Sequence, residues 1–429
     1  MAVKTLPKKQ LTAKVKAEAT PDQLHTNSGI TPPAQNNEGL PAGWRWGKLE
    51  DLLDYIQPTD HIVESTEYND RYKTPVLTPG KSFIKGYTNE TKGIYHDLPV
   101  IIFDDFTTAN KFVNFPFKVK SSAMKILKGK APSTNIKFAF HYMQTLKVST
   151  DTHKRYWISV YSKLSVPLPP LPTQHAIVSK IEELLSELDK GKQQLETAQQ
   201  QLKIYRQAVL KWAFEGRLTN NEVKEGEFPE GWKLRELKEI TSVLGDGLHG
   251  TPKYSENGQY YFINGNNLTD GRIEIKENTK RVQHVEFEKY KKPLNDKTIL
   301  VSINGTLGYT AFYKNEKVVL GKSACYFNVT ENVDKNYVRY YLTSNSFTSY
   351  ANKTATGSTI KNVGLKAMRE FPIPMPPTIE EQHLIVQEIE SRLSVCDKVE
   401  ETIATSLQQA ETLRQSILKK AFEGKLVEY

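Results

Sequence analysis

The sequence predicts an α+β protein in which two globular domains of mixed helix and strand are separated by two long antiparallel coiled-coil helices. The first observation behind this is an internal repeat: residues 174–218 and 382–426 align without a gap, and about half of the aligned positions are identical. The second is that each repeated segment follows a longer block with short strand-like runs and frequent turn residues. The molecule is therefore expected to have a pseudo-two-fold internal repeat.

Each repeated segment is expected to form one long helix, because apolar residues recur every seven positions. A second set of residues with the same spacing follows the first set three positions later. The expected seam residues are Ile181, Leu184, Leu188, Leu195, Leu202, Tyr205, Val209 and Trp212 in the first helix and Ile389, Cys396, Val399, Ile403, Leu413 and Ile417 in the second. About forty helical residues would make each helix roughly 60 Å long. Pairing of the two helices within the chain is the simplest arrangement, and a homodimeric coiled coil is the alternative.

The ends of the long helices carry matching signals. Proline-rich runs at residues 167–172 and 372–377 should stop each helix from extending backwards, and Gly216 and Gly424 are placed to end the helices. Each block opens with P-x-G-W, at residues 41–44 and 229–232. Because their ends match, both halves are expected to consist of a block, a proline run and a helix.

This order defines the expected domains. They are a flexible tail (1–40, with a weak helix around 10–19), block one (41–166), the first proline run and helix (167–218), a linker with block two (219–371), and the second proline run and helix (372–429). Strands are expected at 99–103, 115–119 and 137–140 in block one, and at 259–263, 272–275, 298–303, 309–313 and 324–329 in block two, with a helix at 336–351. The two blocks show no visible alignment with each other.

Composition narrows the class of protein. The chain has 429 residues, 38% of them hydrophobic, which suffices for two or three globular domains. Its two cysteines form neither a disulfide framework nor a metal site and fit a reducing cytosol, and no apolar run is long enough to cross a membrane. The net charge of +9 is concentrated in the two blocks, at roughly +6 for residues 44–166 and roughly +7 for residues 232–371. This favours a polyanionic partner, although ordinary solubility charge is the alternative.

Enzymatic motifs are incomplete. Gly245, Gly247 and Gly250 form G-x-G-x-x-G, but Pro252 and Gly258 break the helix that phosphate binding would require. The Gly-Lys-Ser at residues 321–323 lacks the upstream glycine of a P-loop. Glu274 and Lys276 with Asp246 could form a nuclease triad, but alternating charges on the outer face of a strand explain Arg272, Glu274 and Lys276 at least as well. Asp104 and Asp105 are expected to orient basic residues or to cap a turn, so no catalytic residue and no metal ligand is assigned.

From about residue 40 onward, the architecture resembles the specificity subunit of a type I restriction–modification enzyme. The resemblance rests on the paired helices ending in AFEGRL and AFEGKL, the proline runs and the P-x-G-W entries. Familiar segments inside the blocks are IIFDDFTTANKF, KVKSSAMKIL, GDGLHGTP and TGSTIKNVGLKAM.

The resemblance implies a cytoplasmic, non-catalytic subunit that binds double-stranded DNA at a bipartite site. Each block would recognise one half-site, and the helices would set the spacer between them. The family's partners are two methyltransferase (M) subunits, which carry S-adenosylmethionine, and two restriction/motor (R) subunits, which use ATP and Mg²⁺. Adenine methylation and cleavage would occur on these partners, with no cofactor on this chain and no membrane contact. A stand-alone DNA-binding regulator that dimerises through its helices is the alternative, followed by a nuclease or methyltransferase acting alone.

Candidate DNA contacts are polar and basic residues in predicted loops, because base edges are read by amides and hydroxyls, and phosphates by Lys and Arg. In block one they are Lys81, Lys85, Tyr87, Thr107, Asn110, Lys111, Lys118, Lys120 and Lys125. In block two they are His249, Thr251, Lys253, Asn264, Asn266, Asn267, Thr306, Ser358, Thr359 and Lys361. For each single residue, a solvated or turn-forming role is the competing interpretation.

Overall fold

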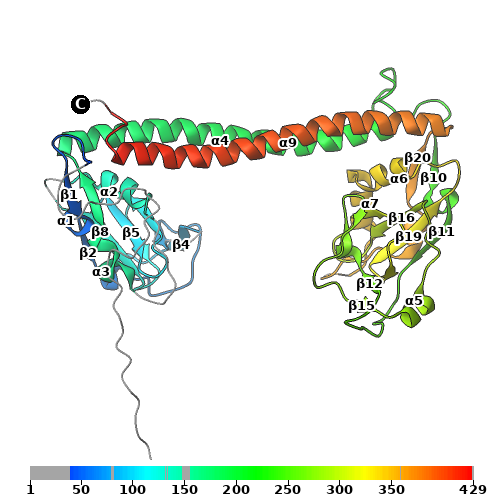
Figure 1. Ribbon diagram of the computed structural model, residues 1–429, viewed down its shortest axis with the longest axis horizontal. Coiled ribbons are helices and arrows are strands. Elements are labelled where there is room, and N and C mark those ends of the chain that lie inside the picture. The colour runs from blue at the N-terminus through cyan, green and yellow to red at the C-terminus, as the bar shows by residue number, and fades with distance from the viewer. Residues whose placement is uncertain are drawn as a thin grey trace, which may run out of the picture. The chain divides into compact units, whose positions relative to one another are not determined.

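The computed structural model describes residues 39–78, 82–130, 132, 134–146, 155–357 and 359–427 (Figure 1). These residues belong to two compact units. Unit 1 is Met1–Gln193 together with Ser406–Tyr429, and unit 2 is Gln194–Thr405. Each unit therefore contains one block and a part of each long helix. No helix in the described part of the chain is long and apolar enough to span a membrane.

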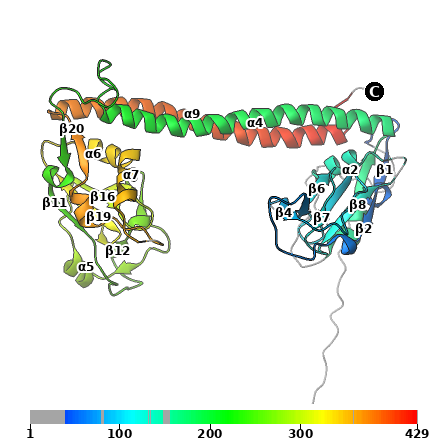
Figure 2. The same cartoon turned by 180° about the vertical axis from the view of Figure 1, so that it is seen from behind.

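Block one in unit 1 is built on two sheets, seen from both sides in Figures 1 and 2. The four-stranded sheet has the order β2 (Leu53–Ile56), β8 (Met124–Gly129), β5 (Val100–Asp104), β6 (Asn110–Val113). The three-stranded sheet has the order β4 (Ile84–Thr88), β3 (Thr74–Leu77), β7 (Lys118–Val119). Only the β3–β7 pair is parallel among these strand pairs. The helical elements are α1 (Leu49–Leu52), η2 (Thr59–His61), α2 (Ile136–Met143), α3 (Tyr156–Ser159) and η3 (Tyr161–Lys163).

Block two in unit 2 repeats this topology despite its unlike sequence. Its four-stranded sheet has the order β11 (Thr241–Asp246), β19 (Ala324–Val329), β16 (Thr298–Ser302), β17 (Thr310–Phe312). Its three-stranded sheet has the order β15 (Arg281–Val282), β12 (Tyr260–Ile263), β18 (Val318–Leu320), again with one parallel pair, β12–β18. A small hairpin, β13 (Leu268–Thr269) and β14 (Arg272–Ile273), is added. The helical elements are η4 (Leu237–Ile240), η5 (Gly265–Asn267), α5 (His284–Tyr290), α6 (Lys335–Leu342), α7 (Asn345–Thr354) and α8 (Leu365–Arg369).

Two expected elements of the blocks are wrong. Residues 137–140 lie in α2 and not in a strand, because the Asn135 side chain caps the helix by accepting from the Lys137 and Phe138 N–H groups. The apolar residues of α2 also follow a helical spacing, with Phe138 and Tyr142 buried on one face. The helix expected at 336–351 is two helices, α6 and α7, because Ser344 has an extended backbone between them. The weak helix around residues 10–19 lies outside the described residues.

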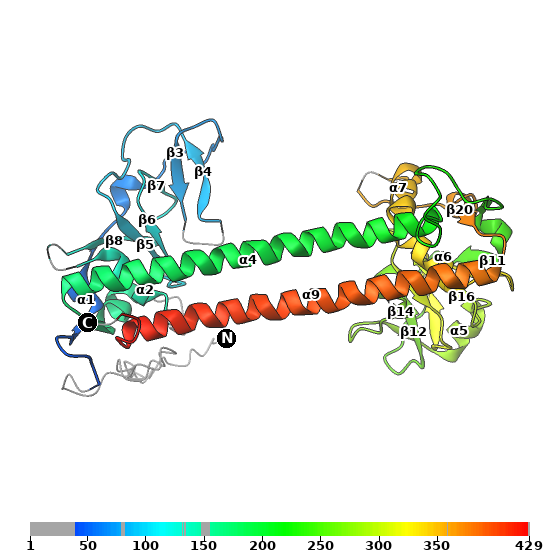
Figure 3. The same ribbon diagram turned by 90° about the horizontal axis from the view of Figure 1, so that it is seen from above.

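The repeated segments form α4 (Leu171–Phe214) and α9 (Ile379–Phe422), each 44 residues long. In both units a part of α4 lies beside a part of α9, as Figure 3 shows from above. The helices run antiparallel, because the partner number falls as the α4 number rises: Asp189 pairs with Arg414 at 3.5 Å and Lys192 with Glu411 at 3.7 Å in unit 1. In unit 2, Arg206 contacts Asp397 at 2.6 Å. The Arg414–Asp189 and Arg206–Asp397 pairs join equivalent positions of the repeat.

Burial along the seam is uneven. Among the expected seam residues, the buried ones are Ile181, Val209, Ile389, Cys396, Ile403 and Ile417, and the half-buried ones are Leu184, Leu188, Leu195, Leu202 and Trp212. Three are exposed, namely Tyr205, Val399 and Leu413. A straight helix has 3.6 residues per turn, so a strict seven-residue column drifts about 20° per heptad away from the partner. Two helices alone also cover only a narrow stripe of each other's surface.

The proline runs contribute to the blocks as well as to the helices. Residues of each run form a short strand that pairs with the residues after P-x-G-W. These pairs are β1 (Arg45–Lys48) with β9 (Ser165–Leu168), and β10 (Lys233–Glu236) with β20 (Pro372–Met375). Helix α4 starts at Leu171, so Pro172 lies in its first turn, where a missing N–H is tolerated. The last proline of this first run is therefore inside the helix.

The end of each long helix packs on a block of the same unit. Phe422, near the end of α9, contacts Phe138 and Tyr142 of block one with ring centroids 5.2 and 5.0 Å apart. Phe214, near the end of α4, contacts Tyr337 of block two at 5.1 Å. The following glycines have positive φ, and a Cβ atom on either Gly216 or Gly424 would lie 2.2 Å from the proline of a P-x-G-W motif. The shared AFEG motif is therefore a packing motif.

A buried glutamine joins the start of each long helix to its block. Gln174 Oε1 accepts from the Asn135 N–H at 2.9 Å, and Gln174 Nε2 donates to the Pro169 carbonyl at 3.0 Å. Gln382 Oε1 accepts in the same way from the N–H of Asp334, at 2.9 Å. Asn135 and Asp334 are the N-cap residues of α2 and α6. The repeated Gln-His pair thus fixes equivalent helices of the two blocks.

Candidate nucleic-acid interface

In block two, several polar loops converge beside the end of β11. They are the segment after β11 with His249, the β16–β17 loop at residues 303–309, the β18–β19 turn with Lys322, and residues 359–364 before α8. A surface depression of about 520 Å³ lies among them, and its lining includes Asp246, His249, Asn304, Lys322, Asn362 and residues 363–365. We call these residues the block-two loop cluster.

Backbone bonds hold these loops together. Leu248 N–H donates to the Leu320 carbonyl at 2.7 Å, and Gly305 N–H donates to the Lys361 carbonyl at 2.9 Å. The Asn304 amide donates to the Asn362 side-chain oxygen at 3.2 Å. The G-x-G-x-x-G segment therefore continues from β11 into a bonded loop and no helix follows it, in contrast to a nucleotide-binding turn.

The block-two candidates fall into two groups. Side chains on the surface are His249, Thr251, Lys253, Asn266, Thr306, Thr359 and Lys361. Two candidates serve the fold instead: buried Asn267 donates to the Glu274 carbonyl at 2.9 Å, and Asn264 accepts from Ser323 at 3.0 Å. Ser358 lies outside the described residues. Asn267 therefore binds the backbone of the β14 region close to it in sequence, and Asn264 binds the β18–β19 turn.

Block one separates its candidates in the same way. Lys85, Thr107, Lys111 and Lys120 are exposed, Tyr87 and Asn110 are half-buried, and Lys81 lies outside the described residues. The expectation that Lys118 and Lys125 contact DNA is wrong, because their side chains are only 4% and 1% exposed. Lys118 pairs with Glu90, and Lys125 lies 3.5 Å from Asp105 and donates to Gln57 at 2.9 Å. Neither ammonium group can face a phosphate without unfolding its surroundings.

Asp104 and Asp105 of block one each have one of the two structural roles expected of them. Asp104 caps a turn, because its Oδ1 atom accepts from the Phe106 N–H at 2.8 Å and the Thr107 N–H at 3.0 Å. Asp105 is buried, pairs with Lys125 and accepts from the Trp157 N–H at 2.8 Å. The turn presents Thr107 to solvent between β5 and β6, which is the position that residues 303–309 occupy in block two.

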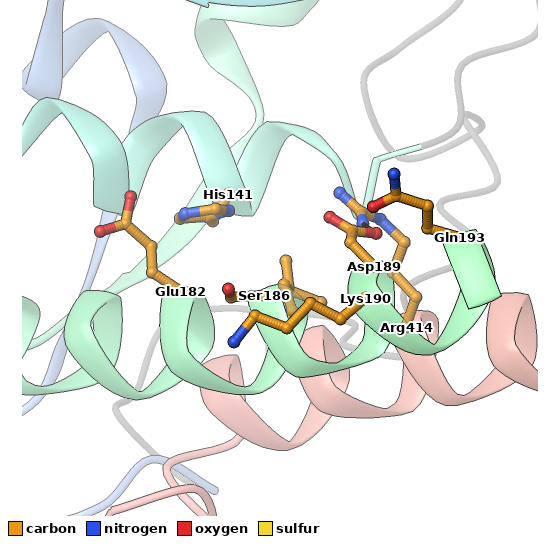
Figure 4. Close-up of a pocket in the computed structure, with 8 residues that line it drawn as sticks. His141, Glu182, Ser186, Asp189, Lys190, Gln193 and Arg414 are labelled. Carbon is orange, nitrogen blue, oxygen red and sulfur yellow. Dashed lines mark ion pairs between the residues drawn. The ribbon is translucent and has the colours of Figure 1, made fainter.

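A different concavity lies between α2 and the long helices of unit 1 (Figure 4). Its lining includes His141, Glu182, Asp189 and Arg414. Burial, together with Arg414 and Lys137, lowers the pKa of His141 to about 4, although Glu182 opposes the shift. Its lining carries charges of both signs, in contrast to a polyanion site. The residues that the structure describes contain no group of three or more His, Cys, Asp or Glu side chains placed to hold a metal ion.

Comparisons with known proteins agree with this architecture. A family model described as "Type I restriction modification DNA specificity domain" matches residues 41–198 and 229–409, so each match contains one block and the start of its long helix. A specificity subunit of the type I restriction enzyme EcoR124I/EcoR124II from Escherichia coli is 32% identical over 357 residues, covering 79% of this chain and 84% of the relative.

This chain belongs to the type I restriction–modification DNA specificity family. The EcoBI specificity subunit of Escherichia coli is a further relative, 24% identical, covering 85% of this chain and 82% of its own. The fold agrees with a chain from a structural study of type I R-M complex assembly, at a TM-score of 0.63 and 18% identity, covering 90% of this chain and 99% of that one. The HsdS subunit from Thermoanaerobacter tengcongensis aligns at a TM-score of 0.50 and 18% identity, covering 90% and 98%. Both of these relatives are specificity subunits of type I restriction enzymes.

Among the polar side chains of the block-two loop cluster, the sequence singled out neither Asn304 nor Lys322 nor Asn362 as a DNA contact. Asn304 precedes Gly305, and an Asn-Gly pair is a turn signal that could have found it. Lys322 lies in the Gly-Lys-Ser that fails as a P-loop, and its exposed position follows from the β18–β19 turn. Asn362 had no signal of its own, because its place depends on a bridge to Asn304, which is 58 residues away along the chain.

Proposed function

We propose that this chain is the non-catalytic specificity subunit of a type I restriction–modification complex and that it binds a bipartite DNA site, with one half-site per block. The observation that carries this is the repetition of one topology and one set of helix junctions around two different sets of exposed loops. Because the two blocks share a topology and differ in their exposed loops, each block can present a different recognition surface from the same position on the long helices.

The proposed partners are those that the family resemblance implies. Two M subunits would supply S-adenosylmethionine and adenine methylation, and two R subunits would supply ATP, Mg²⁺ and cleavage. The basic surface of both blocks would bind double-stranded DNA. Because this complex acts on the cell's DNA, we place it in the cytoplasm. The paired α4 and α9 would set the spacer between the half-sites.

Domain exchange tests this function. The chain is co-expressed with its M subunit, methylated sites are mapped by sequencing, and block two is then replaced by that of a relative with a different target. One half-site should change while the other stays. A change in both half-sites contradicts one block per half-site. Tight, specific binding by the chain without an M subunit would instead favour the stand-alone regulator.

A further inference from the structure

Close backbone contacts hold the loops of the block-two loop cluster in fixed positions. A Cβ atom on Gly247 would lie 2.2 Å from the Leu320 carbonyl oxygen, so the β11 loop crosses the end of β18 at backbone distance. The Leu248–Leu320 bond joins the segment after β11 to the end of β18, and the Gly305–Lys361 bond joins the β16–β17 loop to the segment before α8. The Ile303 N–H donates to the Ser323 carbonyl at 3.0 Å and so joins the β16–β17 loop to the β18–β19 turn. Side chains on these loops are therefore held in position before a ligand arrives, which lowers the entropy cost of binding.

His249 is the most prominent side chain of the cluster. Its Nε2 atom lies 2.5 Å from Asp246 Oδ2, and the imidazole is 68% exposed while the carboxylate is 18% exposed. An ionised carboxylate only accepts, so the Nε2–H group of His249 donates to it. Asp246 thereby orients the ring, and Nδ1 has no hydrogen-bond partner among the residues that the structure describes. A polar atom held outward in this way is available to a ligand.

An amide pair continues the same surface. The Asn304 amide nitrogen donates to Asn362 Oδ1, which leaves the Asn304 oxygen and the Asn362 nitrogen without a side-chain partner in the described part of the chain. One acceptor beside one donor is the pattern that matches the N6 and N7 atoms of adenine in the major groove. Lys322 is exposed on the same depression, and no described carboxylate lies within ion-pair distance of it.

We infer that His249 and the Asn304–Asn362 amide pair contact base edges in the half-site of block two, with Asp246 positioning His249 and Lys322 contacting a phosphate. This rests on the proposed function and assigns base selection to particular side chains. Among the described lining residues, Asp246 is the one carboxylate, and it is bonded to His249, so the remaining surface suits a polar, anionic ligand. Its lining of amide, imidazole and ammonium groups matches a nucleic acid better than an apolar small molecule.

The test uses the complex with M subunits and duplexes in which each base pair of the wild-type site is replaced in turn. His249→Ala should lose about tenfold discrimination at one or two neighbouring base pairs of a single half-site. Asn304→Ala should do the same at a position in that half-site. Lys322→Gln should weaken binding to all duplexes alike and flatten the slope of log affinity against log salt by about 0.9. The matched control is His284→Ala, an exposed histidine of the same block on α5.

The outcomes separate the two claims. If the wild-type complex shows no bipartite preference, the proposed function itself fails. If the wild type is specific and His249→Ala keeps full discrimination at every position, the inference is overturned. Uniform weakening by His249→Ala also overturns it, because that result assigns His249 to the phosphate backbone. Asp246→Asn keeps the side-chain size, so it should reproduce a weaker form of the His249→Ala pattern if Asp246 orients the ring.

Discussion

At the scale of single residues, burial decides what a charged group does. Lys118 and Lys120 are two positions apart, yet Lys118 is buried against Glu90 and Lys120 is exposed. Burial tends to raise the pKa of Glu90, but hydrogen bonds from Lys118 and from the Ser65 and Glu64 N–H groups lower it overall. The pair therefore stabilises block one above the ordinary pKa of a glutamate, and this stability is lost as the pH falls through the lowered pKa.

Variants of Lys118 and Lys120 should differ in their effects on DNA binding and on stability. Lys120→Gln removes an exposed charge, so if it contacts a phosphate it should flatten the salt slope of DNA binding by about 0.9 while leaving stability within about 0.5 kcal/mol. Lys118→Met should leave the slope unchanged and lower the unfolding free energy by about 3 kcal/mol, since Glu90 stays partly buried without its partner. Adding Glu90→Gln should restore part of the loss. Salt titrations and urea unfolding measure the two effects, and equal slopes for all variants would remove Lys120 from the DNA surface.

His141 makes unit 1 sensitive to acid. Its pKa falls to about 4 in the folded chain, from an ordinary value of about 6.5, and the charged groups facing it are Glu182, Arg414 and Lys137. The unfolded chain binds more protons between these values, so stability is complete above about pH 6.5 and is lost as the pH falls towards 4. The shift corresponds to about 3 kcal/mol.

Hydrogen exchange of α2 amides between pH 7.5 and 4.5, corrected for intrinsic rates, should show this loss in the wild type. The variant His141→Gln removes the titrating group and should flatten the pH dependence, whatever its effect on stability at pH 7.5. An unchanged pH dependence in the variant would assign the acid sensitivity to other groups.

At the scale of elements, the two ends of each long helix have different tasks. The starting ends carry the buried glutamines that bind the N-caps of α2 and α6, and the finishing ends carry Phe214 and Phe422, which pack on the aromatic faces of the same two helices. Each block therefore receives the start of one long helix and the end of the other, all within one unit.

Removing one of these glutamines should weaken its own unit. Gln382→Ala leaves the N–H of half-buried Asp334 and the Asn332 carbonyl without their side-chain partner, which costs about 1–2 kcal/mol. Gln387→Ala is the matched control, because Gln387 is exposed on the same helix. Protection of the first α6 amides, measured by hydrogen exchange, should fall in Gln382→Ala and stay in Gln387→Ala. Equal protection in both variants would show that the helix N-cap does not depend on the glutamine.

At the scale of the whole molecule, α4 and α9 are each continuous from one unit into the other. Their ion pairs lie on both sides of the division between the units, so lengthening one helix alone would shift Arg206 relative to Asp397. A clean change in length therefore requires matched insertions in both helices.

Four residues inserted after Gln193 in α4 and four after Thr405 in α9 add about 6 Å and rotate the downstream part of each helix by about 40°. Because one base pair rises about 3.4 Å, the preferred spacer should lengthen by about one or two base pairs with unchanged half-sites. Mapping of methylated sites in cells measures this. The insertion in α4 alone is the control and should reduce assembly. An unchanged spacer in an active, doubly inserted complex would contradict a role for the helices in spacing.

The sequence by itself determined the long helices and the order of the parts. The seven-residue spacing, the proline runs and the glycines at 216 and 424 are local signals, and local signals predict elements well. The duplicated Gln-His and Ala-Phe-Glu-Gly motifs also showed that the two halves are equivalent, although their contacts with the blocks could not be derived from the motifs alone.

Only the tertiary structure decided which polar residues face solvent and that two unlike blocks share one topology. Lys118 depends on Glu90, 28 residues earlier, and Asn304 depends on Asn362, 58 residues later. Such pairs form across separate strands and loops, so no periodicity along the chain records them. The order of strands in a sheet is also set by long-range contacts, since β12 pairs with β18 across more than fifty residues. Many unrelated sequences have the same alternation of buried and exposed side chains, so this alternation does not predict which strands pair. Long-range contacts therefore decided which candidate residues remain on exposed loops.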